Sequence, residues 1–438
     1  MTERTILDQL SYNELPAILV SATLSDDEPF GHDPLDELEA LAETAGMYIV
    51  GKAYQNVERI NPRTYIGKGK VAEVAKMVEE TEAQVVIFDH ELRPNQQNAL
   101  EDECKANVID RTELILAIFS QNVRTRQAKV QVQLAQAEYE LPRLKNLWTH
   151  LERQRGGLGA VGGAGERQIE TDRRLLRKRI TKLRKELDEI GKRRVIEVER
   201  RHELFQVSIV GYTNAGKSTL MNALTEEGVF TEDKLFATLD TRTCVWKLPD
   251  HKVLLSDTVG FIRDLPHRLV ASFHATLEEV LHADLLLHVV DASHPAAVEM
   301  IEAVNEVLAE VKKGSDPVFT EGKQGLTPSQ RTLMVFNKID RVGDQPTLTH
   351  LHNMYPEHVD VSAKTGAGLK ELAQRVQEVV EERETALDWT FSAGNGRLLA
   401  YLQQHGKILD IEYEDSQVHV KALIEPRYYG QAAAMKDA

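Results

Sequence analysis

The sequence predicts an α/β protein built from four parts. Short apolar runs of strand length alternate with helical segments near the N-terminus, heptad spacing covers a long middle stretch, and another strand leads straight into a glycine-rich turn. Such alternation favours a mostly parallel sheet with helices on both faces. We expect an N-terminal α/β domain (1–125), a helical segment (126–203), a second α/β domain (204–385) and a small α+β C-terminal domain (386–438).

The bulk composition argues against several classes of protein. No run of 18 uncharged apolar residues occurs in the 438 residues, so no stable membrane insertion is expected. The N-terminus has no apolar signal segment, and Cys104 and Cys244 are isolated, which predicts a cytoplasmic protein. The net charge is −16, yet residues 143–202 hold 18 Lys or Arg against 9 Asp or Glu. This basic segment is either a contact for a polyanion or a solvated helix surface.

The N-terminal domain is predicted from two strands and the helix between them. The strands are the apolar runs Met47–Val50 and Val85–Phe88, and Val71–Glu82 has helical character. The turn Pro62–Lys70 carries glycines and lysines. It is either a phosphate-binding loop or a plain connection.

The middle segment carries apolar residues at alternating spacings of four and three, a heptad seam that is typical of packed helices. They are Val130, Leu134, Ala137, Leu141, Leu144, Trp148 and Leu151, then Ile169, Leu176, Ile180, Leu183, Leu187 and Ile190, with Arg173 as the one polar position. Two adjacent arms predict an antiparallel hairpin, with an intermolecular coiled coil as the alternative. Pro142 should kink or interrupt the first arm. The joining segment 156–165 has six glycines and is either a surface-probing tip or a simple connector.

A glycine-rich turn follows the strand expected at Phe205–Val210. Its residues match G-x-x-x-x-G-K-S/T and comprise Gly211, Tyr212, Thr213, Asn214, Ala215, Gly216, Lys217 and Ser218, with Thr219 next. The glycines let backbone N–H groups surround phosphates at a helix N-terminus. Lys217 should neutralise the β- and γ-phosphates, and the Ser218 hydroxyl should ligate Mg²⁺. We therefore expect a P-loop that binds a nucleotide with magnesium.

Three further strand ends follow in the order that a GTP site requires. They carry Asp257, Thr258, Val259 and Gly260; then Asn337, Lys338 and Asp340; then Ser362, Ala363 and Lys364. Asp257 would hold Mg²⁺ through water, and the Gly260 N–H would contact the γ-phosphate. The Asp340 carboxylate can accept two hydrogen bonds from guanine, whereas adenine would leave it unpaired. The backbone at Ser362–Lys364 would meet guanine O6, so GTP and GDP are the expected nucleotides.

The residues expected to act in hydrolysis are Lys217, Gly260 and a threonine that reaches Mg²⁺ only when the γ-phosphate is bound. The candidates for this threonine, which would be a second metal ligand beside Ser218, are Thr238, Thr241 and Thr243. Many GTPases orient the attacking water with a Gln after Asp-x-x-Gly, but this chain has Phe261 there. Slow intrinsic hydrolysis is therefore predicted unless a partner supplies the missing group, and Phe261 is equally suited to a core.

These motifs make the chain resemble the HflX family of ribosome-associated GTPases (TRAFAC class, Obg-HflX group) over nearly its whole length. The similar segments are 62–70, 108–116, 133–139, 170–174 and 236–240. The resemblance places Thr238 at the switch I threonine position, which makes it the preferred second metal ligand. A hydrophobic residue commonly follows Asp-x-x-Gly in the family. The resemblance implies the four parts above and binding to the large ribosomal subunit, which stimulates GTP hydrolysis. It also implies a hairpin tip near the peptidyl-transferase rRNA, and splitting or rescue of stalled ribosomes under stress.

Two departures and several alternatives accompany this resemblance. Family loops place an Arg and a Pro among the tip glycines, whereas this chain has Val161, Gly162 and Ala164, which weakens the case for RNA contact there. Residues 312–331 resemble an inserted surface loop.

A ribosome-assembly GTPase is the first alternative function, and a slow-turnover, nucleotide-regulated RNA-binding scaffold that dimerises through its heptads is the second. An ATP-dependent RNA remodeller is disfavoured because no second P-loop is present; a monomer is expected.

Overall fold

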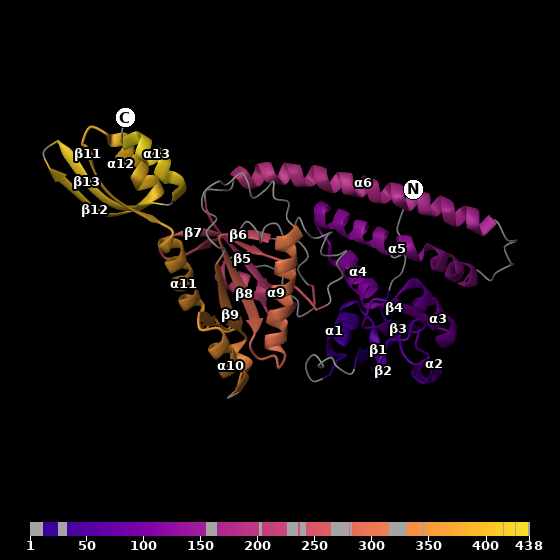
Figure 1. Cartoon of the computed structure of the whole chain (residues 1–438). Coiled ribbons are helices and arrows are strands. Elements are labelled where there is room, and N and C mark those ends of the chain that lie inside the picture. The colour runs from indigo at the N-terminus through magenta and orange to yellow at the C-terminus, as the bar shows by residue number, and fades with distance from the viewer. Residues whose placement is uncertain are drawn as a thin grey trace. The chain divides into compact units, whose positions relative to one another are not determined.

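The chain forms two compact units, Met1–Val245 with Leu254–Gly366, and Trp246–Val253 with Ala367–Ala438. The computed structural model describes residues 12–24, 33–154, 164–200, 204–225, 235–236, 242–263, 280, 283–314, 331–343, 346–414, 416–424 and 426–436. Figure 1 shows the elements of both units. Within the described ranges, no helix has the length and apolar character needed to cross a membrane.

The N-terminal part of the first unit is a four-stranded parallel sheet in the order β2-β1-β3-β4 (Figure 1). Its elements are β1 (Pro16–Leu24), α1 (Asp36–Thr44), β2 (Tyr48–Val57), α2 (Lys68–Thr81), β3 (Val85–Phe88), α3 (Pro94–Cys104), β4 (Asn107–Asp110) and α4 (Arg111–Asn122). Alternate residues of β1 enter two different apolar clusters, Leu19 in one and Ile18 and Val20 in the other. Both faces of the sheet are therefore covered, as the apolar runs of its strands require.

The two strands and the helix predicted for this part are confirmed, with differences in length. Helix α2 begins at Lys68, inside the predicted turn 62–70, and the phosphate-binding interpretation of that turn stays a prediction. The strand expected from Met47 begins at Tyr48 and continues to Val57, and β3 covers the expected run. Because Gly51 and three polar residues interrupt the apolar pattern after Val50, the sequence indicated only the beginning of this strand.

The heptad segment forms a hairpin of α5 (Arg126–Gln154) and α6 (Ala164–Arg200), as predicted. The seam residues of the two arms bury one another; they are Val130, Leu134, Ala137, Leu144, Leu176, Ile180 and Leu183. Ion pairs that join Arg126 to Glu186 and Arg184 to Glu138 cross between antiparallel arms. These seam residues are thus buried by contacts within one chain. Of the predicted tip, residues 156–163 lie outside the described residues.

Helix α5 continues through Pro142 without interruption. Of the two effects expected of this proline, a break therefore does not occur. Helix α6 begins at Ala164, so the last two residues of the predicted tip belong to the second arm instead.

A second sheet has six strands in the order β10-β9-β8-β5-β7-β6. Its elements are β5 (Phe205–Gly211), α7 (Lys217–Leu224), β6 (Arg242–Lys247), β7 (Lys252–Asp257), β8 (Leu285–Asp291), α9 (Ala297–Gly314), β9 (Arg331–Asn337), the 3₁₀ turn η3 (Ile339–Arg341), α10 (Pro346–Met354) and β10 (His358–Asp360). Strands β5, β8, β9 and β10 are parallel, so their carboxyl ends share one edge. In open α/β sheets that edge is where ligands bind.

The second unit is an α+β arrangement, as expected for the C-terminal part. It contains α11 (Leu369–Glu382), β11 (Thr385–Ser392), α12 (Gly396–His405), β12 (Gly406–Glu414), β13 (Gln417–Ile424) and α13 (Pro426–Lys436). The strands pair antiparallel in the order β11-β13-β12. The two strands expected at 408–413 and 418–424 are confirmed, whereas β11 was not predicted. The four-part division by residue number stays a prediction.

Candidate functional site

The predicted phosphate-binding turn joins β5 to α7 and depends on two glycines. Gly211 has φ 151°, and a Cβ there would overlap the carbonyl oxygen of Val289 on the neighbouring strand. Gly216 has φ 89°, and a Cβ there would overlap the side-chain amide of Asn337. L-residues with a side chain avoid such backbone conformations. Only glycine therefore lets this turn lie against β8 and the end of β9.

Lys217 is the buried cation of the turn, with 7% of its surface exposed. Its Nζ donates hydrogen bonds to the carbonyl oxygens of Gly211, at 3.0 Å, and Tyr212, at 2.7 Å. Burial lowers the pKa of this amine to about 8, although the nearby Asp257 carboxylate opposes the shift. The ammonium thus lies where bound phosphates would compensate for its lost hydration.

Ser218 and Asp257 form a pair suited to Mg²⁺. The Ser218 hydroxyl donates to Asp257 Oδ2 at 2.7 Å, while the buried Asp257 Oδ1 has no hydrogen-bond partner among the described residues. Asp257 is 1% exposed, and this burial raises the pKa of its carboxyl. A hard divalent cation prefers oxygen ligands and would satisfy the unpaired carboxylate oxygen. The residues present therefore fit the ion that the motif implies.

Gly260 lies against the phosphate-binding turn. A Cβ on Gly260 would lie 2.7 Å from Thr213 Cγ2 and 3.1 Å from Lys217 Nζ. The Thr213 N–H donates to the Phe261 carbonyl at 2.7 Å, and the Phe261 N–H donates to the Gly211 carbonyl at 3.2 Å. The segment after β7 is thereby held beside the predicted γ-phosphate position.

Phe261 is 2% exposed and belongs to the apolar cluster of this unit. Both interpretations of this residue therefore hold. It is a core side chain, and it leaves the usual glutamine position without a group that could orient water.

The predicted guanine-binding segments meet at the carboxyl ends of β9 and β10. Asn337 donates from Nδ2 to the Ala215 carbonyl at 2.9 Å, and its Oδ1 accepts from the Ala363 N–H at 3.0 Å. The Asn337 side chain thus links the phosphate-binding turn to the segment Ser362–Lys364. Lys338 Nζ pairs with Asp291 at 2.7 Å, at the end of β8.

Asp340 is exposed, not buried. The Ser362 hydroxyl donates to its Oδ1 at 2.6 Å, and this hydrogen bond lowers the pKa of Asp340. The carboxylate is therefore ionised and ready to accept from guanine. An unpaired Asp340 carboxylate therefore costs free energy only when a bound base covers it and excludes water. The sequence does not show this exposure.

Some predicted residues have roles outside nucleotide contact, and others lie outside the described residues. Thr238 and Thr241 lie outside the described residues. Thr243 is exposed on β6 and shares a 3.0 Å hydrogen bond with Ser256. The Thr258 hydroxyl donates to the Ile209 carbonyl at 2.7 Å, so it links the residue after β7 to β5. The insertion expected at 312–331 is described only at its ends, in α9 and β9.

A buried charge network that the sequence analysis missed contacts this site. Arg111, which is 2% exposed, pairs with Glu37 and with Asp89 at 2.8 Å. Arg263, three residues after Gly260, bonds to the same two carboxylates, at 3.3 Å and 2.6 Å. The Tyr212 hydroxyl donates to Glu37 and accepts from the Arg263 N–H at 2.8 Å. The only signal in the sequence was the place of Arg111 in a family-like run.

Comparison with known families matches three successive segments of the chain. Residues 32–120 match the family described as GTP-binding GTPase N-terminal, and residues 122–201 match GTP-binding GTPase Middle Region. Residues 206–322 match the family described as 50S ribosome-binding GTPase.

Individual relatives cover most of the chain. It is 46% identical over 385 residues to GTPase HflX of Magnetococcus marinus, covering 87% of this chain and 86% of the relative. It is 44% identical over 366 residues to GTPase HflX of Escherichia coli, covering 83% and 82%. A crystal structure of a Sulfolobus solfataricus GTP-binding protein in complex with GDP is 25% identical, covers 83% of this chain and 99% of that one, and has a TM-score of 0.41. On the sequence relatives, the chain belongs to the HflX family of GTPases.

Proposed function

We propose that this chain is a cytoplasmic, monomeric GTP-hydrolysing switch that binds the large ribosomal subunit. In this proposal the subunit stimulates hydrolysis, and the protein splits or rescues stalled ribosomes under stress. The observation that carries it is a full set of guanine-nucleotide motifs on the chain that also bears a strongly basic helical arm. The match of residues 206–322 to the 50S ribosome-binding GTPase family supports the choice of partner.

The described residues assign a part of the reaction to each motif. Lys217 would hold the β- and γ-phosphates, and the backbone N–H of Gly260 would contact the γ-phosphate. Ser218 and Asp257 would hold Mg²⁺, with Thr238 joining when GTP is bound. When bound, Mg²⁺ neutralises charge that develops on the phosphates. Because Phe261 cannot orient water, intrinsic turnover should be slow, and a partner should supply the missing group.

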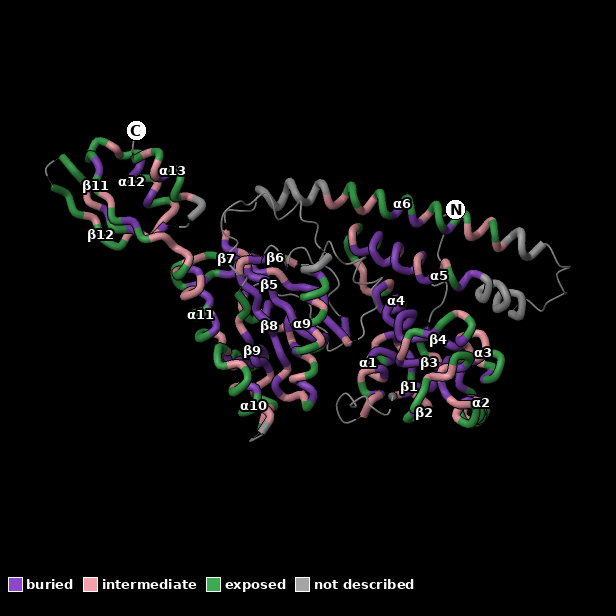
Figure 2. Tube along the Cα trace, viewed as in Figure 1, coloured by how far each residue is buried: buried purple, intermediate pink, exposed green. Residues whose placement is uncertain are grey.

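The exposed face of α6 supports an RNA partner. Its buried side faces α5 through Leu176, Ile180 and Leu183. The exposed cations from residue 174 to residue 185 are Arg174, Arg177, Lys178, Lys182 and Lys185, together with Arg184, which pairs with Glu138 of α5. Figure 2 shows this alternation of buried and exposed residues along α6. A chain with net charge −16 that gathers cations on one helix face favours local contact with a polyanion.

The test is GTP turnover with and without purified large ribosomal subunits, measured across a range of salt concentrations. The proposal expects stimulation that weakens as salt rises, because cation–phosphate contacts release counterions. Replacing Arg177 and Lys182 by alanine should weaken subunit binding and reduce the slope of log affinity against log salt by about two, roughly one per lost contact. The matched control replaces the exposed Lys370 and Arg397 of the second unit and should leave the slope unchanged.

Three outcomes separate the alternatives. Sedimentation of intact ribosomes should show subunit release that depends on this protein and GTP if splitting is correct. Binding to precursor but not mature subunits would identify an assembly factor instead. Absence of turnover at every salt concentration, with nucleotide still bound, would favour the scaffold and contradict the switch.

A further inference from the structure

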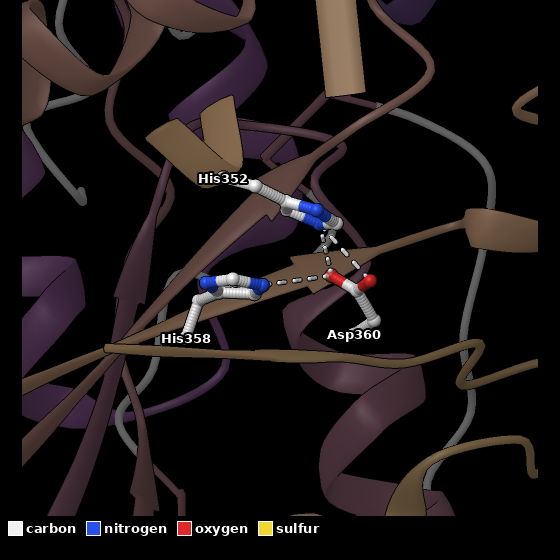
Figure 3. Close-up of side chains that lie close together, drawn as sticks. All are labelled: His352, His358 and Asp360. Carbon is white, nitrogen blue, oxygen red and sulfur yellow. Dashed lines mark hydrogen bonds and ion pairs between the residues drawn. The ribbon is translucent and has the colours of Figure 1, made fainter. Parts of the chain in front are cut away.

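Three potential metal ligands meet beside the predicted guanine loop (Figure 3). His352 comes from α10, whereas His358 and Asp360 come from β10, and one ligand atom of each lies within 4.8 Å of the others. We infer that these three side chains form a binding site for a transition-metal ion, of which Zn²⁺ fits best. The inference does not depend on the proposed ribosomal function.

The local fold explains why these side chains converge. His358 and Asp360 are two positions apart on a strand, so their side chains leave the same face. The short connection after α10 places His352 over that face. Its Nε2 lies 3.1 Å and 3.0 Å from the two oxygens of Asp360, and His358 Nε2 lies 4.0 Å from Oδ1. Both rings thus direct the same kind of nitrogen at one carboxylate, as Figure 3 shows.

A backbone hydrogen bond assigns the proton on His358. Its Nδ1 lies 2.7 Å from the carbonyl oxygen of Tyr355, which can only accept, so Nδ1 carries the hydrogen. In the neutral ring, Nε2 then presents a lone pair toward Asp360. Two acceptors would face each other there, and a cation between them would satisfy both. Metal-binding histidines commonly donate their other ring nitrogen to a carbonyl in this way.

The stacking of the rings disfavours a state in which both histidines are charged. The rings of His352 and His358 are 4.1 Å apart and inclined by 17°. Two imidazolium charges at that separation would repel each other. The fully buried Phe336 ring stacks against His352 and packs at an inclination of 40° against His358. A divalent ion would bind the carboxylate and both neutral rings after the rings turn out of their stack, so that both Nε2 lone pairs point at one ion with bonds of ~2.0–2.2 Å.

The ligand set determines the class of ion. Two imidazole nitrogens and one carboxylate suit Zn²⁺, Cu²⁺, Ni²⁺ or Co²⁺, whereas Mg²⁺ and Ca²⁺ prefer oxygen alone. The side chains of His352, His358 and Asp360 remain 33%, 20% and 33% exposed. Solvent can therefore reach a fourth position, as in zinc sites with three protein ligands.

The position of the site predicts its effect. Val361 follows Asp360, donates its N–H to the Phe336 carbonyl at 2.8 Å, and accepts from the Ile339 N–H at 3.3 Å. The chain then enters Ser362, the first residue of the predicted guanine loop. An ion that joins α10 to β10 would stabilise this edge of the sheet and raise the thermal midpoint of the protein.

The experiment uses the full-length chain, stripped of metal by a chelator and then saturated with Mg²⁺ and GDP so that the phosphates are occupied. Zn²⁺ is titrated by calorimetry, and Co²⁺ binding is followed by its visible absorption, which reports the coordination number and geometry of the ion. One site is expected that raises the thermal midpoint. His352→Gln, His358→Gln and Asp360→Asn should each weaken this site at least tenfold. His350→Gln is the matched control, because His350 is exposed on the same helix outside the cluster.

The inference is overturned if the three variants bind Zn²⁺ as tightly as the unchanged protein, or if His350→Gln removes the same site. It also fails if the unchanged protein shows no saturable site. GDP affinity, measured in parallel, shows that each variant is folded, so a lost metal site is distinguishable from a lost structure.

Discussion

Raising the pH should weaken binding of guanine nucleotides through one lysine. Burial lowers the pKa of Lys217 to about 8 in the free protein, so roughly half of the molecules carry a neutral amine at pH 8. Phosphates bind the ammonium form and raise its pKa again. Binding should therefore take up ~0.1 proton per nucleotide at pH 7, ~0.5 at pH 8 and ~0.8 at pH 8.5 from this group.

The direction and size of the effect follow from the same shift. Affinity should be constant well below pH 8 and then approach a loss of about tenfold per pH unit, because the protein must first be protonated. The displacement of the pKa from 10.5 to about 8 corresponds to about 3 kcal/mol. That free energy is the cost of keeping a buried ammonium at neutral pH, and bound phosphates would recover it.

Calorimetry with GDP and Mg²⁺ can measure this uptake directly. Titrations at pH 7, 8 and 8.5, in two buffers of different ionisation enthalpy, give the number of protons bound. Lys217→Ala should retain weak binding and lose the rise in uptake between pH 7 and 8.5. Equal uptake at all three pH values in the unchanged protein would show that Lys217 is not the titrating group, and the reasoning from its burial would be wrong.

Three substitutions test other parts of the site. Asp340→Asn should weaken GTP binding about tenfold or more, since a charged hydrogen bond is worth ~1–3 kcal/mol. In competition with a fluorescent nucleotide, the variant should favour xanthosine triphosphate. Unchanged GTP affinity would contradict the guanine assignment. Gly216→Ala should weaken GDP binding, because its φ of 89° strains an L-residue by roughly 1–2 kcal/mol and its Cβ has no room; Gly343→Ala, with open space around its Cβ, is the control. Tyr212→Phe should lower the free energy of unfolding by ~1–3 kcal/mol in urea, because the partly buried Glu37 carboxylate loses a donor. The exposed hydroxyl of Tyr54 should be dispensable in the same assay, and equal losses in both variants would contradict the role of the network.

The contiguous nucleotide-binding motifs could be identified from the sequence because each forms a local structure. A strand, a glycine-rich turn and a helix N-terminus follow one another within residues 205–224, and φ values of 151° and 89° explain both glycines. The guanine segments stand at strand ends for the same reason, since parallel strands bring their carboxyl ends to one edge. The exposure of Asp340 could not be read in this way, because it depends on what surrounds the loop.

The hairpin shows where periodicity stops being informative. Heptad spacing identified the buried face of both arms, including Val130 and Leu183, but the same face could pair within or between chains. In the structure, the two helical arms pair with each other within the chain. Pro142 likewise had two expected effects, and the surrounding helix continued through it.

By itself, the sequence determined the fold class, the order of the nucleotide motifs and the apolar faces of the long helices. Those features depend on residues close in the chain, whose spacing reflects strand and helix periods. Only the tertiary structure decided which distant charges meet. Asp89 and Arg263 pair across 174 positions, and Glu37 joins Tyr212 across 175. The convergence of His352 with Asp360 likewise depends on how a helix packs on an edge strand, because no local period brings a helix residue and a strand residue to one point.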